Sequence, residues 1–161
     1  MKSITFQPIG MIYSKHTRPH GTPIQFSGAK NDSGEIEIFP EFQDGLIDLE
    51  GFSHIILLYY FHRANFQSLT VKPFMDDAEH GVFATRSPAR PNPIGFSIVK
   101  LNRIQGNRLF IQGVDALNET PLLDIKPYVP NFDQVEADKI GWLENNIHKH
   151  WTTKDDGRFI K

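Results

Sequence analysis

The chain has 161 residues and no cysteine; 39% of its residues are apolar and 22% are charged. This length suits one domain with its own core, no run approaches the ~18 apolar residues of a membrane helix, and disulfides and cysteine–zinc sites are excluded. The formal net charge of −2 gives no general attraction for nucleic acid, so RNA binding would depend on local basic clusters.

The N-terminal third alternates between strand patterns and polar breaks. Phe6–Tyr13 predicts a first strand, in which Gly10 is a candidate for a β-bulge. Ser14–Gly28 is rich in proline and glycine and predicts a long loop, which is either a binding loop or a mobile surface loop. Gly34–Phe39 has the two-residue alternation of a half-buried strand, and Glu41–Leu49 predicts a short helix.

The most apolar run of the chain is Ile55–Phe61, with seven consecutive apolar residues. It is too short to cross a membrane and predicts a strand that is covered on both faces. His54 and His62 lie on either side of it. The following segment, Asn65–His80, is polar and irregular and predicts no regular element.

The organising stretch of the sequence is Gly81–Ser97, which contains three prolines and two arginines. Each proline fixes its own φ and disfavours helical geometry in the residue before it, so the stretch is neither a helix nor a central strand. A stiff loop that holds Arg86 and Arg90 suits recognition of a carboxylate, a phosphate or a nucleoside edge. A single arginine beside a single proline would indicate only a surface loop, but Ser87 and Asn92 add hydrogen-bonding groups here.

The second half of the chain contains a hairpin signal. Ile94–Ile104 and Arg108–Val114 are strand-like and are separated by Gln105, Gly106 and Asn107. A turn at Asn118–Pro121 follows, and Leu122–Ile125 returns to a strand pattern. We interpret Asp115, close to this turn, as a turn cap.

The C-terminal residues predict one helix and a frayed tail. Asp133 and Glu136 have the spacing of a capping box. Apolar residues then recur at helical intervals, although Gly141 weakens the pattern. The repeat consists of Ile140, Leu143, Ile147 and Trp151, and the tail is Lys154–Lys161.

Six or seven strands without regular β–α alternation predict a mainly β fold, an antiparallel sheet or barrel with short helices and a C-terminal helix. We expect one domain over residues 1–161, with its core at about 8–133 and the helix and tail at 134–161. No dinucleotide-binding glycine motif follows a strand, and no nucleophile elbow is present. The histidine spacings match no recognised metal site, so we expect no bound metal.

Two long motifs stand out in the sequence: ATRSPARPNPIG at Ala84–Gly95 and GVDALNETPLLDIKPY at Gly113–Tyr128. They resemble the TsaA-like (TrmO) family of S-adenosylmethionine-dependent tRNA methyltransferases. The resemblance extends over roughly Pro8–Asp133. It implies a single-sheet β-barrel that binds S-adenosylmethionine, in agreement with the strand pattern.

The resemblance also implies a set of cofactor-binding residues from several segments. His62 and Arg63 match residues of the family's cofactor pocket. From the residues alone, His62 could position an adenine ring or take a proton, or it could equally cap the end of the strand. Asp124 could accept hydrogen bonds from a ribose hydroxyl or from the methionine amine. The candidate set is Pro23, Ile24, Gln25, His62, Arg63, Arg86, Phe96, Glu119, Thr120, Pro121, Leu122 and Asp124.

The function that the resemblance implies is methylation of N6 of threonylcarbamoyl-adenosine at position 37 of tRNA. From charge and position, Arg86 or Arg90 is the candidate for positioning the threonylcarbamoyl carboxylate. Two alternatives stay open: a non-catalytic module that senses S-adenosylmethionine, and a methyltransferase that acts on a small metabolite. The negative net charge and the lack of the extra C-terminal domain of bacterial relatives favour the sensor.

The candidate segments are widely spread along the chain, and two-fold association is the commonest way to bring distant loops together. We therefore expect a homodimer with the cofactor pocket near the subunit interface, as the resemblance also implies. Pairing two copies of the basic clusters at Lys15–His20 and Arg86–Arg90 would build a local basic surface on an acidic protein. Because the N-terminus has no secretion-signal pattern, we expect a cytoplasmic protein.

Overall fold

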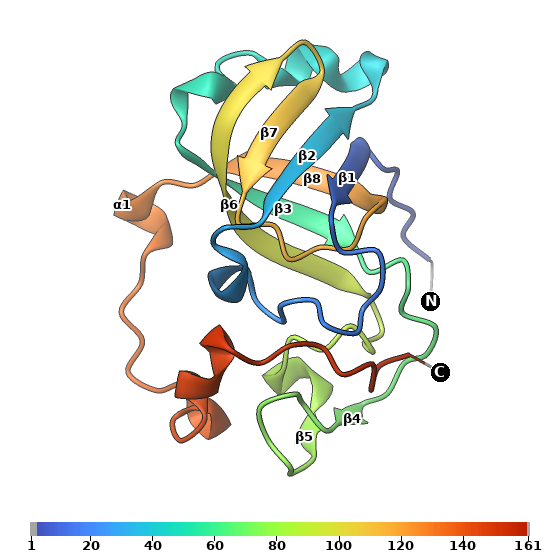
Figure 1. The fold of residues 1–161 in the computed structure, drawn as a ribbon, viewed down its shortest axis with the longest axis vertical. Helices are drawn as coiled ribbons and strands as arrows, with labels where there is room; N and C mark the ends of the chain where they lie inside the picture. The colour runs from blue at the N-terminus through green and yellow to red at the C-terminus, as the bar shows by residue number, and fades with distance from the viewer. Residues whose placement is uncertain (1–2, 161) are drawn as a thin grey trace.

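A computed structural model describes residues 3–160, in which six strands close into an antiparallel barrel (Figure 1). Their order around the barrel is β1-β2-β7-β6-β3-β8, which confirms the mainly β prediction. A small separate sheet pairs β4 with β5. The strands are β1 (Gly10–Ser14), β2 (Ser33–Ile38), β3 (His54–Tyr60), β4 (Thr70–Val71), β5 (His80–Gly81), β6 (Ile94–Gln105), β7 (Arg108–Gln112) and β8 (Thr120–Pro127).

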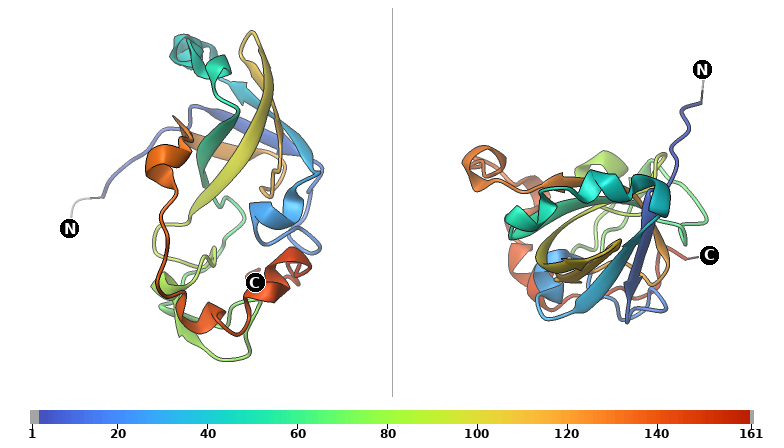
Figure 2. Two further views of the ribbon diagram at one scale, coloured as in Figure 1. Left: turned by 90° about the vertical axis from the view of Figure 1, so that its left-hand side faces the viewer. Right: turned by 90° about the horizontal axis from the view of Figure 1, so that it is seen from above.

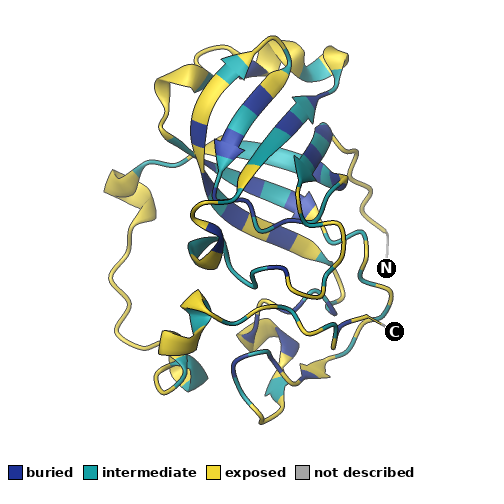
Figure 3. Cartoon of the chain, in the orientation of Figure 1, coloured by how far each residue is buried: buried dark blue, intermediate teal, exposed yellow. Residues whose placement is uncertain are grey.

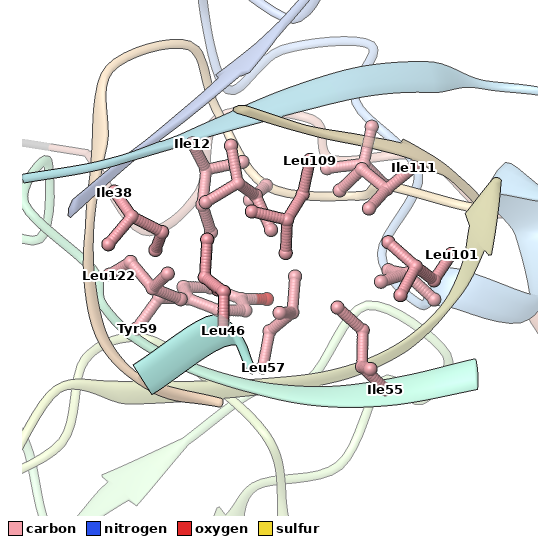
Figure 4. Packing of buried hydrophobic residues seen from close by; sticks show 14 residues of the cluster. Ile12, Ile38, Leu46, Ile55, Leu57, Tyr59, Leu101, Leu109, Ile111 and Leu122 are labelled. Carbon is pink, nitrogen blue, oxygen red and sulfur yellow. The ribbon is translucent and has the colours of Figure 1, made fainter. Parts of the chain in front are cut away.

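The barrel interior is filled by aliphatic side chains that alternate along each strand (Figures 3 and 4). On β3, Ile55, Leu57 and Tyr59 are buried, whereas Leu58 is half-buried and Tyr60 is exposed. The prediction that this strand is covered on both faces was wrong. In a closed barrel only the inner face is sealed from solvent, and apolar residues of the outer face pack against loops or stay exposed.

The end of the barrel away from the long loops is closed by a 3₁₀ helix and a hairpin. The helix spans Pro40–Leu46, replaces the short helix expected at Glu41–Leu49, and buries Leu46 in the core (Figure 4). The hairpin joins β6 to β7 through Gly106 and Asn107, as predicted. Gly106 has a φ of +61°, a left-handed conformation that glycine adopts without strain.

Gly10 allows close strand approach and does not form a bulge. It pairs in register with Ile38 of β2 and Leu122 of β8. A Cβ at Gly10 would overlap the Glu37 carbonyl oxygen and would lie 3.1 Å from the Ile38 Cα. The absence of a side chain at Gly10 therefore allows β1 and β2 to lie at their close spacing.

The single C-terminal helix that we predicted is absent from the described residues. A one-turn helix, α1 (Pro130–Asp133), is followed by 3₁₀ helices at Gly141–Leu143 and Ile147–Trp151. The Asp133 carboxylate accepts a hydrogen bond from the Val129 N–H at 2.6 Å, so it caps α1 and does not begin a later helix. Gly141 has a φ of +58°, which interrupts right-handed helix geometry.

The expectation of a frayed tail was also wrong as far as residue 160; Lys161 lies outside the described residues. Lys154 forms a β-bridge with Pro23, and the Gly21 N–H donates to the Asp155 carbonyl at 2.7 Å. Phe159 is only 6% exposed in a second apolar cluster with Val71, Val82 and Ala89. The C-terminal segment therefore runs back along the loop end of the barrel, as Figures 1 and 2 show.

We expect Gly10→Ala to lower the free energy of unfolding, because the new methyl group would force β1 away from the β2 backbone. Overpacking of this kind costs about 1–3 kcal/mol. The matched control is Gly45→Ala, since a Cβ at Gly45 meets no atom within 4 Å. Urea denaturation of both variants measures the difference, and equal midpoints would contradict the close-approach account.

Candidate functional site

A cavity of about 1010 Å³ lies at the end of the barrel where the long connections gather. Three connections meet there: residues 15–32 between β1 and β2, 61–93 between β3 and β6, and 113–119 between β7 and β8. The volume is at the upper limit for small-molecule sites. Several of the lining residues belong to the predicted set: Pro23, Ile24, Gln25, His62, Arg63, Arg86, Arg90, Phe96 and Thr120.

The proline-rich loop holds one of its two arginines against its own backbone. Arg90 Nη1 donates to the Thr85 carbonyl at 3.1 Å and to the Ser87 carbonyl at 3.4 Å. Ala89 of the same loop is fully buried. Arg90 therefore stabilises the loop and also lines the cavity. Two of its hydrogen bonds are made to the protein itself and are not available to a ligand.

Arg86 joins two segments that are far apart in the sequence. Its Nη1 donates to Gln25 Oε1 at 2.9 Å, and its guanidinium lies 5.9 Å from the centre of the Phe96 ring. Phe96 in turn makes an edge-to-face contact with Phe26, with the two ring centroids 6.4 Å apart. Because its hydrogen-bond partner is a neutral amide, Arg86 keeps a positive charge for an anionic group in the cavity.

His62 presents an unused nitrogen at the cavity wall. Its Nδ1 lies 3.3 Å from Thr120 Oγ1, while its Nε2 is buried and has no hydrogen-bond partner among the described residues. Burial lowers the pKa of His62, the Arg63 charge lowers it further, and Glu119 opposes the shift. A buried nitrogen without a partner is costly in a folded protein, so His62 Nε2 is a candidate for hydrogen bonding to a ligand in the cavity.

A series of hydrogen-bonded polar side chains, which the sequence analysis missed, lies at the mouth of the barrel. Ser97 Oγ donates to Asp115 Oδ1 at 2.5 Å, and the Tyr59 hydroxyl lies 3.0 Å from Ser97 Oγ. Asp115 and Tyr59 both line the cavity. Burial raises the pKa of Asp115 to about 6, although the Ser97 hydrogen bond and the Arg86 charge oppose the shift. The interpretation of Asp115 as a turn cap did not include this contact, for which the signal in the sequence was a serine at an inward position of β6.

Four residues of the predicted cofactor set do not lie on the cavity wall of this chain. Leu122 is fully buried in the barrel core, and Glu119 is exposed in a turn with a φ of +59°. Asp124 forms an ion pair of 2.7 Å with Lys126. The fourth of these residues, Pro121, is half-buried on β8.

The C-terminal segment forms one wall of the cavity, which sequence reasoning also missed. Trp142 Nε1 donates to the Ala84 carbonyl at 2.8 Å, and the indole stacks on His80 with ring centroids 4.7 Å apart. Lys149 Nζ donates to the Met75 carbonyl at 3.2 Å. The lining residues from this segment are Trp142, Leu143, Ile147, His150, Asp155, Phe159 and Ile160.

Residues 3–160 contain no group of three or more His, Asp or Glu side chains that could hold a metal ion. Within the same residues, no helix is long and apolar enough to cross a membrane.

The sequence model of the tRNA-methyltransferase O N-terminal domain matches residues 11–134. The chain belongs to this family. A probable S-adenosyl-L-methionine-binding protein of Pyrococcus abyssi is 58% identical over 98% of this chain and 85% of its own length. The tRNA (adenine(37)-N6)-methyltransferase of Mus musculus is 37% identical over 89% of this chain. The crystal structure of TrmO from Pseudomonas aeruginosa superposes with a TM-score of 0.73 at 38% identity over 88% of this chain.

This member of the tRNA-methyltransferase O family spans only part of some relatives. It covers 34% of the mouse enzyme and 63% of the Pseudomonas aeruginosa TrmO chain. The family match ends at residue 134, whereas the cavity wall continues to Ile160. The C-terminal wall therefore lies outside the residues that the family model matches, although the Pyrococcus abyssi relative aligns over 98% of this chain.

We expect His62 to titrate below pH 6.5, because burial and the Arg63 charge both disfavour the imidazolium. Stability that depends on the neutral ring is then present above pH 6.5 and is lost as the pH falls through the lower pKa of the folded state. Nitrogen-15 NMR of the imidazole, assigned with His62→Asn, measures the midpoint. A midpoint at or above 6.5 would contradict this account.

Proposed function

We propose that this protein is an S-adenosylmethionine-dependent methyltransferase that methylates N6 of threonylcarbamoyl-adenosine 37 in tRNA. The observation that carries the proposal is the cavity of about 1010 Å³ in a member of the tRNA-methyltransferase O family, because a buried histidine nitrogen without a partner and two arginines meet there. Relatives named as tRNA (adenine(37)-N6)-methyltransferases support the reaction class. A tRNA substrate is consistent with the cytoplasmic location that the sequence leads us to expect.

The cavity residues fit S-adenosylmethionine. His62 Nε2 offers a hydrogen bond to a polar edge, the Phe96 ring offers an aromatic face, and the Gln25 amide offers a further polar contact. When bound, the cofactor supplies a methyl group on a positively charged sulfur, which makes the methyl carbon electrophilic. The protein's task is to align the acceptor nitrogen with that carbon and to keep water out.

Arg86 is the better candidate for the threonylcarbamoyl carboxylate. Arg90 already donates to two backbone carbonyls of its own loop. Arg86 is exposed, lines the cavity and makes its side-chain hydrogen bond to a neutral amide. A guanidinium can bind a carboxylate through two parallel hydrogen bonds, which would fix the modified base in one orientation.

The alternative that the comparisons favour most is an S-adenosylmethionine-binding module without transferase activity. The 58% identical relative from Pyrococcus abyssi is named only as a probable binding protein. Incubation with labelled S-adenosylmethionine and either bulk tRNA or free nucleosides separates the alternatives. Label in tRNA supports the proposal, label only in small molecules indicates a metabolite methyltransferase, and tight binding without transfer indicates a sensor.

We expect Arg86→Ala to reduce kcat/KM for tRNA by about ten- to a hundredfold, because losing a charge-assisted hydrogen bond costs roughly 1.5–3 kcal/mol. Its melting temperature should change little, since the side chain is exposed. Arg108→Ala is the matched control, because Arg108 pairs with Glu35 on the barrel surface, outside the cavity. A lower melting temperature with full activity per folded molecule would remove Arg86 from the site.

A homodimer with the cavity at its interface completes the proposal. Phe96, Leu58 and Asp124 lie side by side on the outer face of three neighbouring strands, β6, β3 and β8. Strand spacing places Asp124 about 10 Å from Phe96, at the edge of the cavity. Exposed apolar side chains continue this face along β3 and β6, with Tyr60 at 41% and Ile94 at 37% exposure. A second subunit on this face would extend the cavity toward Asp124.

We expect sedimentation at micromolar concentration to give about twice the chain mass of 18.4 kDa. Tyr60→Asp, which places a charge in the exposed apolar face, should shift the protein toward the monomer and weaken S-adenosylmethionine binding. Glu41→Lys, a change of charge at the far end of the barrel, is the control. A monomer that binds the cofactor with full stoichiometry would exclude an interface pocket.

A further inference from the structure

We propose that Asp115 is the residue that accepts the proton released from the acceptor nitrogen during methyl transfer. This inference rests on the proposed function and deepens it, because it assigns the general base of that reaction. It comes from the placement of the carboxyl group on the cavity wall at the end of a hydrogen-bonded chain of neutral hydroxyl groups.

The row of hydrogen-bonded side chains runs from inside the barrel to the cavity. Tyr59 and Ser97 point inward from β3 and β6, and Ser97 Oγ donates to Asp115 Oδ1 at 2.5 Å. Tyr59 Oη lies 3.0 Å from Ser97 Oγ and can donate to it, because the Ser97 proton is directed to the carboxylate. The two hydroxyl groups therefore fix the orientation of a carboxylate at the cavity wall.

The carboxylate has no cationic partner at ion-pair distance among residues 3–160. The charges and titratable groups that act on it are the Arg86 guanidinium and the Tyr59 phenol. His62 also lines the cavity. A carboxylate that served only to stabilise the fold would be expected to pair with a cation or to cap backbone N–H groups of neighbouring residues. Here the anion faces a space large enough for a cofactor and a nucleoside.

The proposed step balances without any further reactant. The lone pair of the N6 nitrogen forms a bond to the methyl carbon, the carbon–sulfur bond breaks, and its electron pair stays on sulfur as a neutral thioether. The nitrogen becomes positively charged and strongly acidic as the new bond forms. Its proton then passes to the Asp115 carboxylate, and the methylated nitrogen is neutral again.

A weak base is sufficient for this step. The raised pKa of Asp115, about 6, leaves the group mostly ionised near neutral pH while making it a better proton acceptor than an ordinary aspartate. His62 is less suited to the role. Burial disfavours a positive charge on its ring, and its Nδ1 already lies 3.3 Å from Thr120 Oγ1.

The first test is Asp115→Asn, which keeps an acceptor for the Ser97 hydroxyl but cannot take a proton. We expect kcat for tRNA methylation to fall about 10²- to 10⁴-fold, with the Kd for S-adenosylmethionine within about threefold of the wild-type value. The raised pKa means that the carboxylate opposes folding as the pH rises from 3.8 through about 6. The variant should therefore melt no lower than the wild type at pH 7.5. Asp77→Asn, at a fully exposed carboxylate, is the control.

The second test is the pH profile of Ser97→Ala. The wild-type rate should rise with pH through about 6, as Asp115 loses its proton. Because the Ser97 hydrogen bond lowers the pKa of Asp115, its removal should move the midpoint of this rate increase to higher pH. If the midpoint of this rate increase is the same in Ser97→Ala and the wild type, the assignment is wrong. It is also wrong if Asp115→Asn keeps more than a tenth of the wild-type turnover. If Asp115→Asn does not fold, the Ser97→Ala profile decides.

The failure of the proposed function has a different signature. Wild-type protein that binds S-adenosylmethionine but transfers no label to tRNA or nucleosides overturns the methyltransferase proposal, and the proton acceptor with it. Active wild-type protein whose Asp115 and Ser97 variants behave like the wild type overturns only the role of Asp115.

Discussion

The register between β3 and β6 is the constraint on which the candidate site depends. Tyr59 pairs with Gly95, and Leu57 pairs with Ser97. A Cβ at Gly95 would overlap the Tyr59 ring, so only glycine lets the ring lie across β6. That position brings the Tyr59 hydroxyl to Ser97, and Ser97 to Asp115. The aliphatic interior of the barrel thus ends in a polar group at the cavity.

The closed barrel explains why one end of the molecule holds the candidate chemistry. Antiparallel closure returns β1, β3 and β7 to the same rim, and the connection that leaves each of them contributes to the cavity. The stiff proline-rich loop then fixes Arg86 and Arg90 over that rim. Rigid strands below and proline-restricted backbone above leave little conformational freedom for a ligand to remove on binding.

Much of the fold and part of the site could be predicted from local sequence signals. Gly106 and Asn107 specify a hairpin, and alternation identified the strands, because both signals depend on neighbouring residues only. The prolines between Arg86 and Ile94 correctly indicated an irregular loop. The Asp115–Ser97 contact could not be predicted, because it depends on barrel closure that brings together residues from separate strands and loops.

The C-terminal segment shows the limit of periodicity. Its apolar residues recur at helical intervals, but Gly141 interrupts the helix and the Trp142 indole binds the Ala84 carbonyl of the proline-rich loop. Tertiary contacts determine the path of this segment, and they cannot be predicted from the local sequence pattern. The consequence is a cavity wall built from residues that follow residue 134, where the match to the family model ends.

The central claim is that this cavity binds S-adenosylmethionine. A crystal structure of the protein with S-adenosylhomocysteine, the product left after methyl transfer, tests it most directly. The account predicts that the product lies in the cavity at the barrel mouth, with one of its polar atoms within hydrogen-bond distance of His62 Nε2. Product bound at another surface, with the His62 nitrogen still without a partner, would contradict it.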